Sequence, residues 1–551
     1  MSADRPREVP KLLLLVGVLY LVAFPYHPGL RSPNELSRLW EARALVEYHV
    51  LDLNQALRDY GYVGDLAFKD GKYYLSKAPL LSFLAAPIYW GLRAASGGRR
   101  FSVPELAQVY WSRLLLTVLP TLYALWLVRK FLAAYVAAPL ADAVTATYAL
   151  GTLALSYSLL FMSHQTTAVL LFSAFFALWR VGRGEWRDRG AVLAGAAAGA
   201  AIAAEYTGAL GLLGLVVFGA VQVLGGDGTR RERLVRLGRI AGLATLGALP
   251  FVAGLMAYHQ ACFGHPLHSG YKYLADVAYQ PWHLGGFLGI RTPDPRAFAL
   301  SLFSPLRGLF SLSPFLLVGV AGLPTVWRGG KPLRPAFWMC AVLLAGYGYF
   351  TSSFDYVSWG WTTGPRHLTP LVPFLLLPFA LLVSKLRAGT RFGDRVGRGV
   401  AAGAAAVSVL VTGALSFVNY IPDSVSSALF SLVVPLYREG YLPPTLLAVL
   451  GVPNPGSGAA LLAGLLAAAI WVAVVMLRPG SEEAAAPAPA ARGRAELVQA
   501  VAVAVLTAGA CLGLLAFAAR DDAGDAGAKS LLESVWLAPT GRTIDLWPKQ
   551  R

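Results

Sequence analysis

The chain has 551 residues, of which 56% are hydrophobic and only 14% are charged. A soluble domain carries roughly a quarter charged residues. Here the apolar residues fall in blocks of about 20, the length that a helix needs to cross a membrane. The formal net charge of +17 does not indicate a nucleic-acid partner, because the basic residues separate apolar segments instead of lining a soluble face. We therefore exclude a soluble protein and predict an all-α polytopic membrane protein with about thirteen transmembrane helices.

The charges between the apolar blocks predict the orientation in the membrane. Basic clusters such as Arg129-Lys130 and Arg328 to Arg334 occupy alternate connections, and the connections between them are nearly free of Lys and Arg. By the positive-inside rule, this alternation predicts a cytoplasmic N-terminus. A span at 80–95 would invert every later loop, so we interpret this segment as a helix lying in the outer interface. The predicted spans are 11–26, 106–128, 131–150, 155–179, 190–204, 206–224, 238–258, 308–327, 334–352, 367–384, 399–419, 457–477 and 496–519.

The first outer loop carries a carboxylate at the start of a predicted helix. Pro33, Asn34 and Glu35 stand at a turn, and apolar residues then recur at helical spacing from Leu36 to Val46. Glu35 has two interpretations. It complements the dipole of this helix, or it removes a proton from a substrate hydroxyl at the membrane boundary.

The same loop contains a predicted hairpin and two further charged candidates. Asp70-Gly71 is a strong turn signal between strand-like runs, so we interpret Asp70 as a turn residue only. Asp65 is either a loop cap or an active-site acid. Lys77 precedes the return of the chain to the bilayer. It either extends its amine to the interface or binds a phosphate at headgroup depth, which we prefer.

Residues 351–370 form a short outer connection that is rich in aromatic and basic side chains. The preference of Trp for membrane interfaces is enough to explain Trp361. Arg366 is next to His367 and directly follows Pro365 at the start of a predicted span, where an arginine fork suits a phosphate. Arg307 is a weaker phosphate-binding candidate near the end of another span.

Polar residues within or between later spans are candidates for the wall of a substrate cavity. His164 lies in the polar stretch SHQTT, which either joins helices by hydrogen bonds or faces a substrate. Glu205 and Tyr206 lie between two spans on the outer side and are predicted to line the same cavity. The three cysteines have no metal-ligand spacing, and no His, Cys or carboxylate spacing predicts a metal site.

Three of these segments together resemble motifs of the GT-C membrane glycosyltransferases, which use polyprenyl-phosphate sugars. They are SPNELSRLWEARALVE, GDLAFKDGKYYLSKAPLLSFLAAP and WGWTTGPRHLTPLVPFL, and they are most similar to the protein O-mannosyltransferase and lipid A aminoarabinose transferase group. The resemblance implies a catalytic or positioning acid at Glu35 and donor-phosphate contacts at Lys77 and Arg366. Many members carry an acidic pair where this chain has Asn34 before Glu35. We therefore predict no cofactor, and dependence on a divalent metal stays open. His164 stands where many relatives have an acid.

The predicted organisation places the resemblance in the first two thirds of the chain. Residues 1–385 are predicted to form a GT-C-like catalytic module with outer loops at 27–105 and 259–307. Further spans follow at 386–480, with an outer loop at 420–456. A cytoplasmic Ala/Pro-rich linker at 481–495 then leads to a last span with an outer tail at 496–551.

The function expected from these features is inverting transfer of a sugar. The donor is a polyprenyl-phosphate-linked sugar, and the acceptor hydroxyl belongs to a glycolipid, a protein or a cell-wall glycan. The reaction is expected on the outer face of a bacterial cytoplasmic membrane, among membrane lipids. Two alternatives are a lipid or glycolipid flippase, which would place charges deep in broken helices, and a non-catalytic membrane scaffold.

Overall fold

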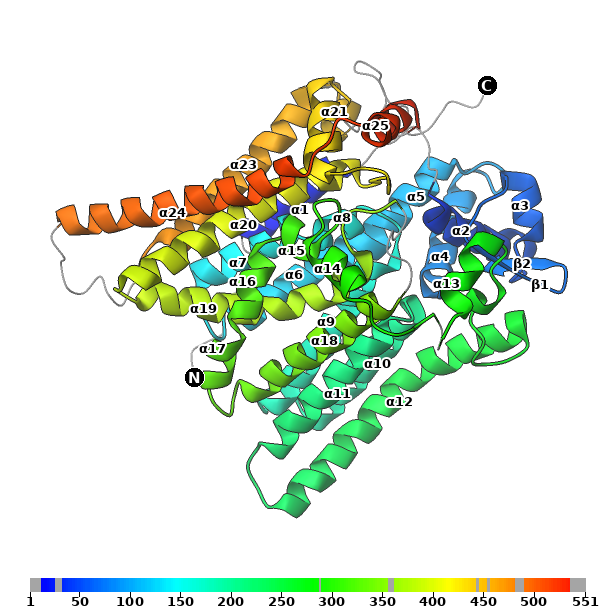
Figure 1. Ribbon diagram of the computed structural model, residues 1–551. Helices are drawn as coiled ribbons and strands as arrows, with labels where there is room; N and C mark the ends of the chain where they lie inside the picture. The colour runs from blue at the N-terminus through cyan, green and yellow to red at the C-terminus, as the bar shows by residue number, and fades with distance from the viewer. Residues whose placement is uncertain are drawn as a thin grey trace.

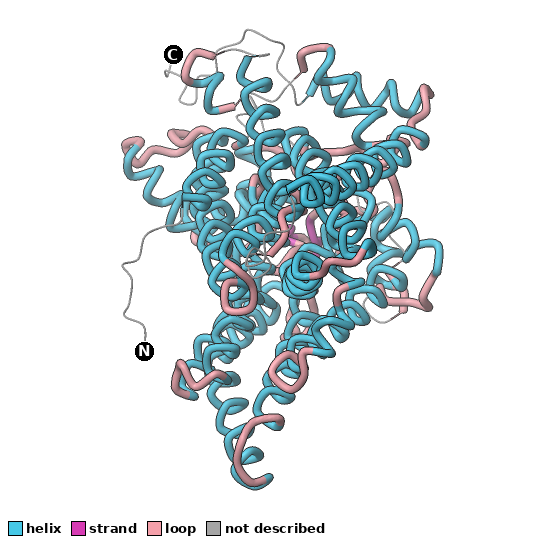
Figure 2. The backbone as a smooth tube through the Cα atoms, turned by 90° about the vertical axis from the view of Figure 1, so that its left-hand side faces the viewer, coloured by secondary structure: helices cyan, strands magenta, loops and turns pink. Residues whose placement is uncertain are grey.

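The computed structural model describes residues 11–24, 32–286, 289–354, 361–441, 445–452, 456–480 and 490–535, and it is almost entirely helical (Figures 1 and 2). Seven of its helices are long and apolar enough to cross a membrane. These are Glu105–Leu132, Ser163–Gly182, Arg230–Phe263, Arg366–Ala388, Phe392–Val418, Gly456–Leu477 and Gly493–Phe517. The chain is therefore a polytopic helical membrane protein, and the count of about thirteen spans stays a prediction.

At six of the predicted spans, the helices are too short, too polar or too interrupted to count among these seven. The helices in these six regions are α1 (Lys11–Ala23), α7 (Ala138–Leu150), α10 (Ala191–Ala204), α11 (Gly208–Leu224), the series α15 (Leu309–Leu312), α16 (Phe315–Ala321) and α17 (Leu323–Arg328), and α18 (Arg334–Ser353). The predicted interfacial segment forms α4 (Leu80–Ala95), which packs against the outer helix α2 (Pro33–Arg43). Sixteen helical residues rise only about 24 Å, less than a bilayer core.

The first long loop builds a compact layer over one end of the helical bundle. Its helices α2 and α3 (Asn54–Tyr60) are followed by the antiparallel strands β1 (Leu66–Lys69) and β2 (Lys72–Leu75). The predicted hairpin is confirmed, and Asp70 and Gly71 both have positive φ values, as a tight two-residue turn requires. In Figure 1 this layer lies on the right, together with α13 (Gln280–Leu284).

Two helical groups stand beneath this layer. In one, α10 packs between α9 (Ser163–Gly182) and α12 (Arg230–Phe263), and α11 packs against α9 and α18. In the other, α20 (Phe392–Val418) packs against α23 (Gly456–Leu477) and α24 (Ala490–Phe517). The remaining helices are α5 (Glu105–Arg113), α6 (Leu119–Leu132), α8 (Leu153–Ser158), α14 (Pro295–Phe303), α19 (Leu376–Ala388), α21 (Val434–Arg438), α22 (Leu446–Val449) and α25 (Ala523–Val535). Residues 481–489 of the predicted linker and residues 536–551 of the predicted tail lie outside the described residues.

Two predicted spans are interrupted, each for a physical reason. The prediction of one helix over 155–179 is wrong, because α8 ends at Ser158 and α9 begins at Ser163. The intervening backbone is free to bind a side chain: the N–H of Phe161 donates to the Glu35 carboxylate. The predicted span 367–384 begins as a 3₁₀ helix, Arg366–Leu375, in which Pro370 and Pro373 lack the N–H groups that an α-helix uses.

Close contact between α10 and α12 depends on glycine. A Cβ atom at Gly247 would lie 2.0 Å from the carbonyl oxygen of Val192, whereas one at Gly242 on the same helix would meet nothing within 4 Å. We expect Gly247→Leu to cost at least about 1–3 kcal/mol of stability through overpacking. The measurement is the thermal midpoint of unfolding in detergent, with Gly242→Leu as the matched control. Equal midpoints for the two variants would contradict this packing.

Candidate functional site

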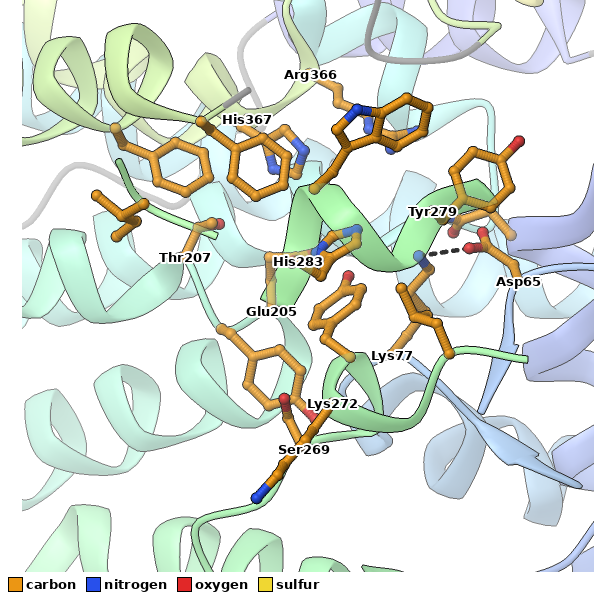
Figure 3. Close-up of a pocket in the computed structure, with 18 of the residues that line it drawn as sticks. Asp65, Lys77, Glu205, Thr207, Ser269, Lys272, Tyr279, His283, Arg366 and His367 are labelled. Atoms are coloured by element: carbon orange, nitrogen blue, oxygen red, sulfur yellow. Dashed lines mark hydrogen bonds and ion pairs between the residues drawn. The ribbon is translucent and has the colours of Figure 1, made fainter. Parts of the chain in front are cut away.

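A large cavity lies where the layer built by the first long loop meets the helical bundle, with a volume of about 1320 Å³ (Figure 3). One side of it is apolar and is formed by α11, α12 and α18. The other side carries charged and aromatic groups from the first loop, from the α10–α11 junction, from residues 266–290 and from the start of the 3₁₀ helix at Arg366. A molecule with a charged head and a hydrocarbon tail would match both sides. The apolar lining includes Leu210, Val252, Leu255, Met256, Phe350 and Phe354.

Lys77 and Asp65 form an ion pair in the cavity wall. The Lys77 Nζ atom lies 2.8 Å from Asp65 Oδ1, and both residues belong to the segments that flank the hairpin. The hydroxyl of Ser76 donates to the Asp65 carbonyl at 2.6 Å, which ties the two flanking segments together. Asp65 has a left-handed backbone, with φ of +66°, so its carboxylate is aimed by a conformation that a non-glycine residue rarely adopts.

The ion pair keeps both groups charged. Burial disfavours the charged form of Asp65, but the Lys77 ammonium outweighs it and holds the pKa of Asp65 below its ordinary value. Burial likewise disfavours charged Lys77, yet Asp65 and Tyr271 hold the pKa of Lys77 above its ordinary value. The cavity therefore contains a permanent ammonium group with a carboxylate holding it in place.

Arg366 supplies a second cation to the same cavity from a segment far along the chain. It begins the 3₁₀ helix directly after Pro365, and it lines the cavity together with Lys77. Its Nε atom is buried, and no described residue accepts a hydrogen bond from it. In Figure 3, Arg366 and His367 lie at the top of the cavity, Lys77 lies below them, and Asp65 lies to the right of Lys77. Two cations are thus available to one anionic group.

Aromatic rings from residues 266–290 cover the cation site. Tyr271 and His283 stack with ring centroids 4.5 Å apart, and Lys77 Nζ lies 4.9 Å from the Tyr271 ring centroid. Burial, with the nearby Lys77 charge, lowers the pKa of His283 to about 4, so this ring is neutral at physiological pH. Neither Tyr271 nor His283 was predicted from the sequence, because no local motif marks them.

Most of the other residues predicted to face a substrate do lie in the wall of the cavity. Asn34, Glu205, Tyr206, Trp361 and His367 all line the cavity. The Tyr206 hydroxyl is hydrogen-bonded to His259 Nε2 at 2.9 Å. His164 does not line the cavity but lies directly behind its wall, with its ring 5.1 Å from that of His367.

Glu35 lies elsewhere than expected. It is fully buried, it does not line the cavity, and both its oxygens are bound by Arg113, at 2.8 and 2.9 Å. The N–H of Phe161, at 2.6 Å, and the hydroxyl of Tyr420 also donate to it. A carboxylate with every lone pair engaged in this way ties α2 to α5 and to the segment between α8 and α9, and it is not poised to take a proton from a substrate. The geometry thus corrects the expectation that Glu35 faces the cleft.

Arg307 also lies away from the cavity wall. Its guanidinium is buried and ion-paired with Asp423, which itself lines the cavity. Arg307 therefore stands behind Asp423 and does not itself face the cavity. Among the described residues, no group of three His, Cys, Asp or Glu side chains is arranged to hold a metal ion, so the open question of a divalent metal gains no site here.

Three solved structures are similar to this chain. ArnT from Cupriavidus metallidurans has a TM-score of 0.46 at 13% identity, over 96% of this chain and 88% of that one. The oligosaccharyltransferase of Archaeoglobus fulgidus has a TM-score of 0.39 at 13% identity, over 74% of this chain and 55% of its own. The arabinosyltransferase EmbB from Mycobacterium smegmatis has a TM-score of 0.42 at 14% identity, over 94% of this chain and 42% of its own.

The second and third are sugar transferases by name, and ArnT has also been solved bound to undecaprenyl phosphate. No protein-family model and no curated protein sequence matches the chain. Because the TM-scores are below 0.5, the function proposed below rests on the residues of the cavity and not on these likenesses.

Proposed function

We propose that this protein is a membrane glycosyltransferase that moves a sugar from a polyprenyl-phosphate donor to an acceptor hydroxyl. The observation that carries the proposal is the position of Lys77 and Arg366. These two cations come from segments far apart in the chain, and they line one cavity whose other side is apolar. Such a cavity suits a phosphate joined to a long hydrocarbon chain, because the tail and the head need opposite surroundings at a fixed separation.

The chemistry follows from where charge develops. The acceptor oxygen forms a bond to the anomeric carbon while the bond from that carbon to the phosphate oxygen breaks, so negative charge grows on the departing polyprenyl phosphate. Lys77 and Arg366 stabilise this charge more in the transition state than in the ground state, which is the condition for catalysis. Asp65 contacts Lys77 and acts as a positioning residue for it.

The side of the membrane and the acceptor belong to the same proposal. The charge pattern of the loops supports an outer location for the cavity, since the first loop carries it and alternate connections are basic. The acceptor would be a glycolipid, a protein or a cell-wall glycan of a bacterial envelope.

A direct test is to purify the protein and look for its donor. Native mass measurement should find undecaprenyl phosphate bound after it is added in detergent. Undecaprenyl-phosphate-linked hexoses and pentoses, incubated with an envelope extract that supplies the acceptor, should release undecaprenyl phosphate. Binding without any sugar transfer would favour the flippase alternative, and absence of both would overturn the proposal.

Donor affinity is expected to be constant between about pH 5 and pH 9. Because the pKa of Asp65 is lowered, its carboxylate loses its charge only at a pH below the ordinary pKa of an aspartate. Because the pKa of Lys77 is raised, its ammonium group loses its charge only at a pH above the ordinary pKa of a lysine. Arg366 stays charged throughout, and His283, with a pKa of about 4, stays neutral. Dissociation constants for an undecaprenyl-phosphate-linked hexose at pH 5, 7 and 9 check this. A tenfold change across the range would contradict the assignment of these groups.

A further inference from the structure

Glu205 is the carboxylate of the cavity wall whose surroundings differ from those of the other acids. It lies at the end of α10, where the backbone is extended, and it lines the cavity. Its Oε2 atom accepts a hydrogen bond from the Ser163 hydroxyl at 2.5 Å. Its Oε1 atom accepts no hydrogen bond from any residue that the structure describes. One oxygen is therefore anchored and the other is available.

A chain of hydrogen bonds fixes the anchored oxygen. Arg38 donates to the Ser163 hydroxyl at 3.2 Å and to the backbone carbonyl of Asn34 at 2.7 Å. Ser163 has one proton, and it donates that proton to Glu205, so its oxygen receives the Arg38 N–H. The Nδ1 atom of His164 lies 3.6 Å from Glu205 Oε2 on the same side. Side chains from α2 and α9 therefore orient the carboxylate before any substrate arrives.

The other lining acids are held by partners of a different kind. Asp65 is ion-paired with Lys77, and Asp423 is ion-paired with Arg307. Asp276 caps a short turn by accepting the N–H of Ala278. Within the described part of the chain, Glu205 is the lining acid whose carboxylate is held by a neutral hydroxyl instead of a cation or a backbone turn. Its second oxygen is therefore open to a substrate hydroxyl in the cavity.

We infer that Glu205 is the general base of the proposed reaction. This inference rests on the proposed function. The acceptor hydroxyl gives its proton to Glu205 Oε1 as its oxygen bonds to the anomeric carbon, and polyprenyl phosphate departs with the electron pair of the broken bond. The Lys77–Asp65 pair and Arg366 serve the leaving group, while Glu205 serves the acceptor. The role expected of Glu35 from the sequence passes to a residue 170 positions along the chain.

Two variants separate this role from a structural one. Glu205→Gln should bind undecaprenyl phosphate with the wild-type dissociation constant and should transfer sugar to the envelope acceptor about 10²–10⁴-fold more slowly. Glu205→Ala should be equally slow with that acceptor, but adding sodium azide should yield a glycosyl azide, because azide attacks without losing a proton. Ser163→Ala, which removes only the anchor, should lose less activity than either. Glu185→Gln is the matched control, because Glu185 forms ion pairs with Arg180 and Arg183 beyond the far end of α9.

The outcomes are distinguishable. Transfer by Glu205→Gln within threefold of wild type overturns the inference and leaves the proposed function standing. Folded Glu205→Ala that binds undecaprenyl phosphate but forms no glycosyl azide also overturns it, since the residue would then support the site in another way. A wild-type protein that neither binds undecaprenyl phosphate nor consumes any donor overturns the proposed function itself.

Discussion

Replacing Lys77 by Met is expected to lower sugar transfer by about 10²–10³-fold, equivalent to about 2–4 kcal/mol of transition-state stabilisation. The Nζ atom of Lys77 is part of the cavity wall, it is held by Asp65 at 2.8 Å, and its charge is maintained despite burial. Methionine keeps the length and apolar volume of the side chain, so the substitution removes little besides the charge and its hydrogen bonds. The loss should be measured as kcat/KM for an undecaprenyl-phosphate-linked sugar.

Arg366 should behave in the same way, and a nearby lysine provides the control. Arg366→Met removes the second cation and should cost a similar factor, whereas Arg366→Lys should cost less because a point charge remains. Lys72 lies on the hairpin just before Lys77 but pairs with Asp52 outside the cavity, so Lys72→Met should leave transfer unchanged. Full activity in both Lys77→Met and Arg366→Met would remove the phosphate site from the proposed mechanism.

Glu35→Gln is expected to destabilise the protein by about 3–5 kcal/mol, the usual cost of breaking a buried ion pair by removing one partner. Glu35 and Arg113 are 0% and 1% exposed, and the substitution leaves the arginine charge buried without its counter-charge. The thermal midpoint in detergent should fall sharply, and the yield of folded protein should fall with it. The double variant Glu35→Gln/Arg113→Gln should recover part of the loss, since it leaves no unpaired buried charge.

This result would decide between two roles for Glu35. A variant that unfolds early, and is rescued in stability by the second substitution, identifies a structural ion pair. A Glu35→Gln protein with the wild-type midpoint, wild-type binding of undecaprenyl phosphate and no transfer would restore Glu35 as the base and would contradict the arrangement described here.

Local features of the fold were readable from the sequence because their causes are local. The turn at Asp70-Gly71, the helix that starts at Pro33 and the short helix at 80–95 all depend on residues within a few positions of one another. The predicted convergence of Lys77 and Arg366 on one cavity also agrees with the structure, since both precede segments that return to the bilayer from the same side.

Features that depend on distant partners could not be read in this way. The interruption of 155–179 follows from a backbone N–H that binds Glu35, 126 residues away along the chain. Nothing near Glu35 shows that Arg113 will occupy it, and nothing near Tyr271 or His283 shows that their rings will stack over Lys77.

The sequence by itself determined the class of molecule: a helical membrane protein, with a long polar loop that supplies a lysine to the cavity. Apolar block length and charge placement are properties of the chain, and the membrane responds to them directly. Only the tertiary structure decided which acids are available. Glu35 and Glu205 are the same residue type at buried positions, but one is closed by an arginine from α5 and the other is held by a serine and faces the cavity. A carboxylate's chemistry is set by the groups packed around it, and those groups come together only in the folded chain.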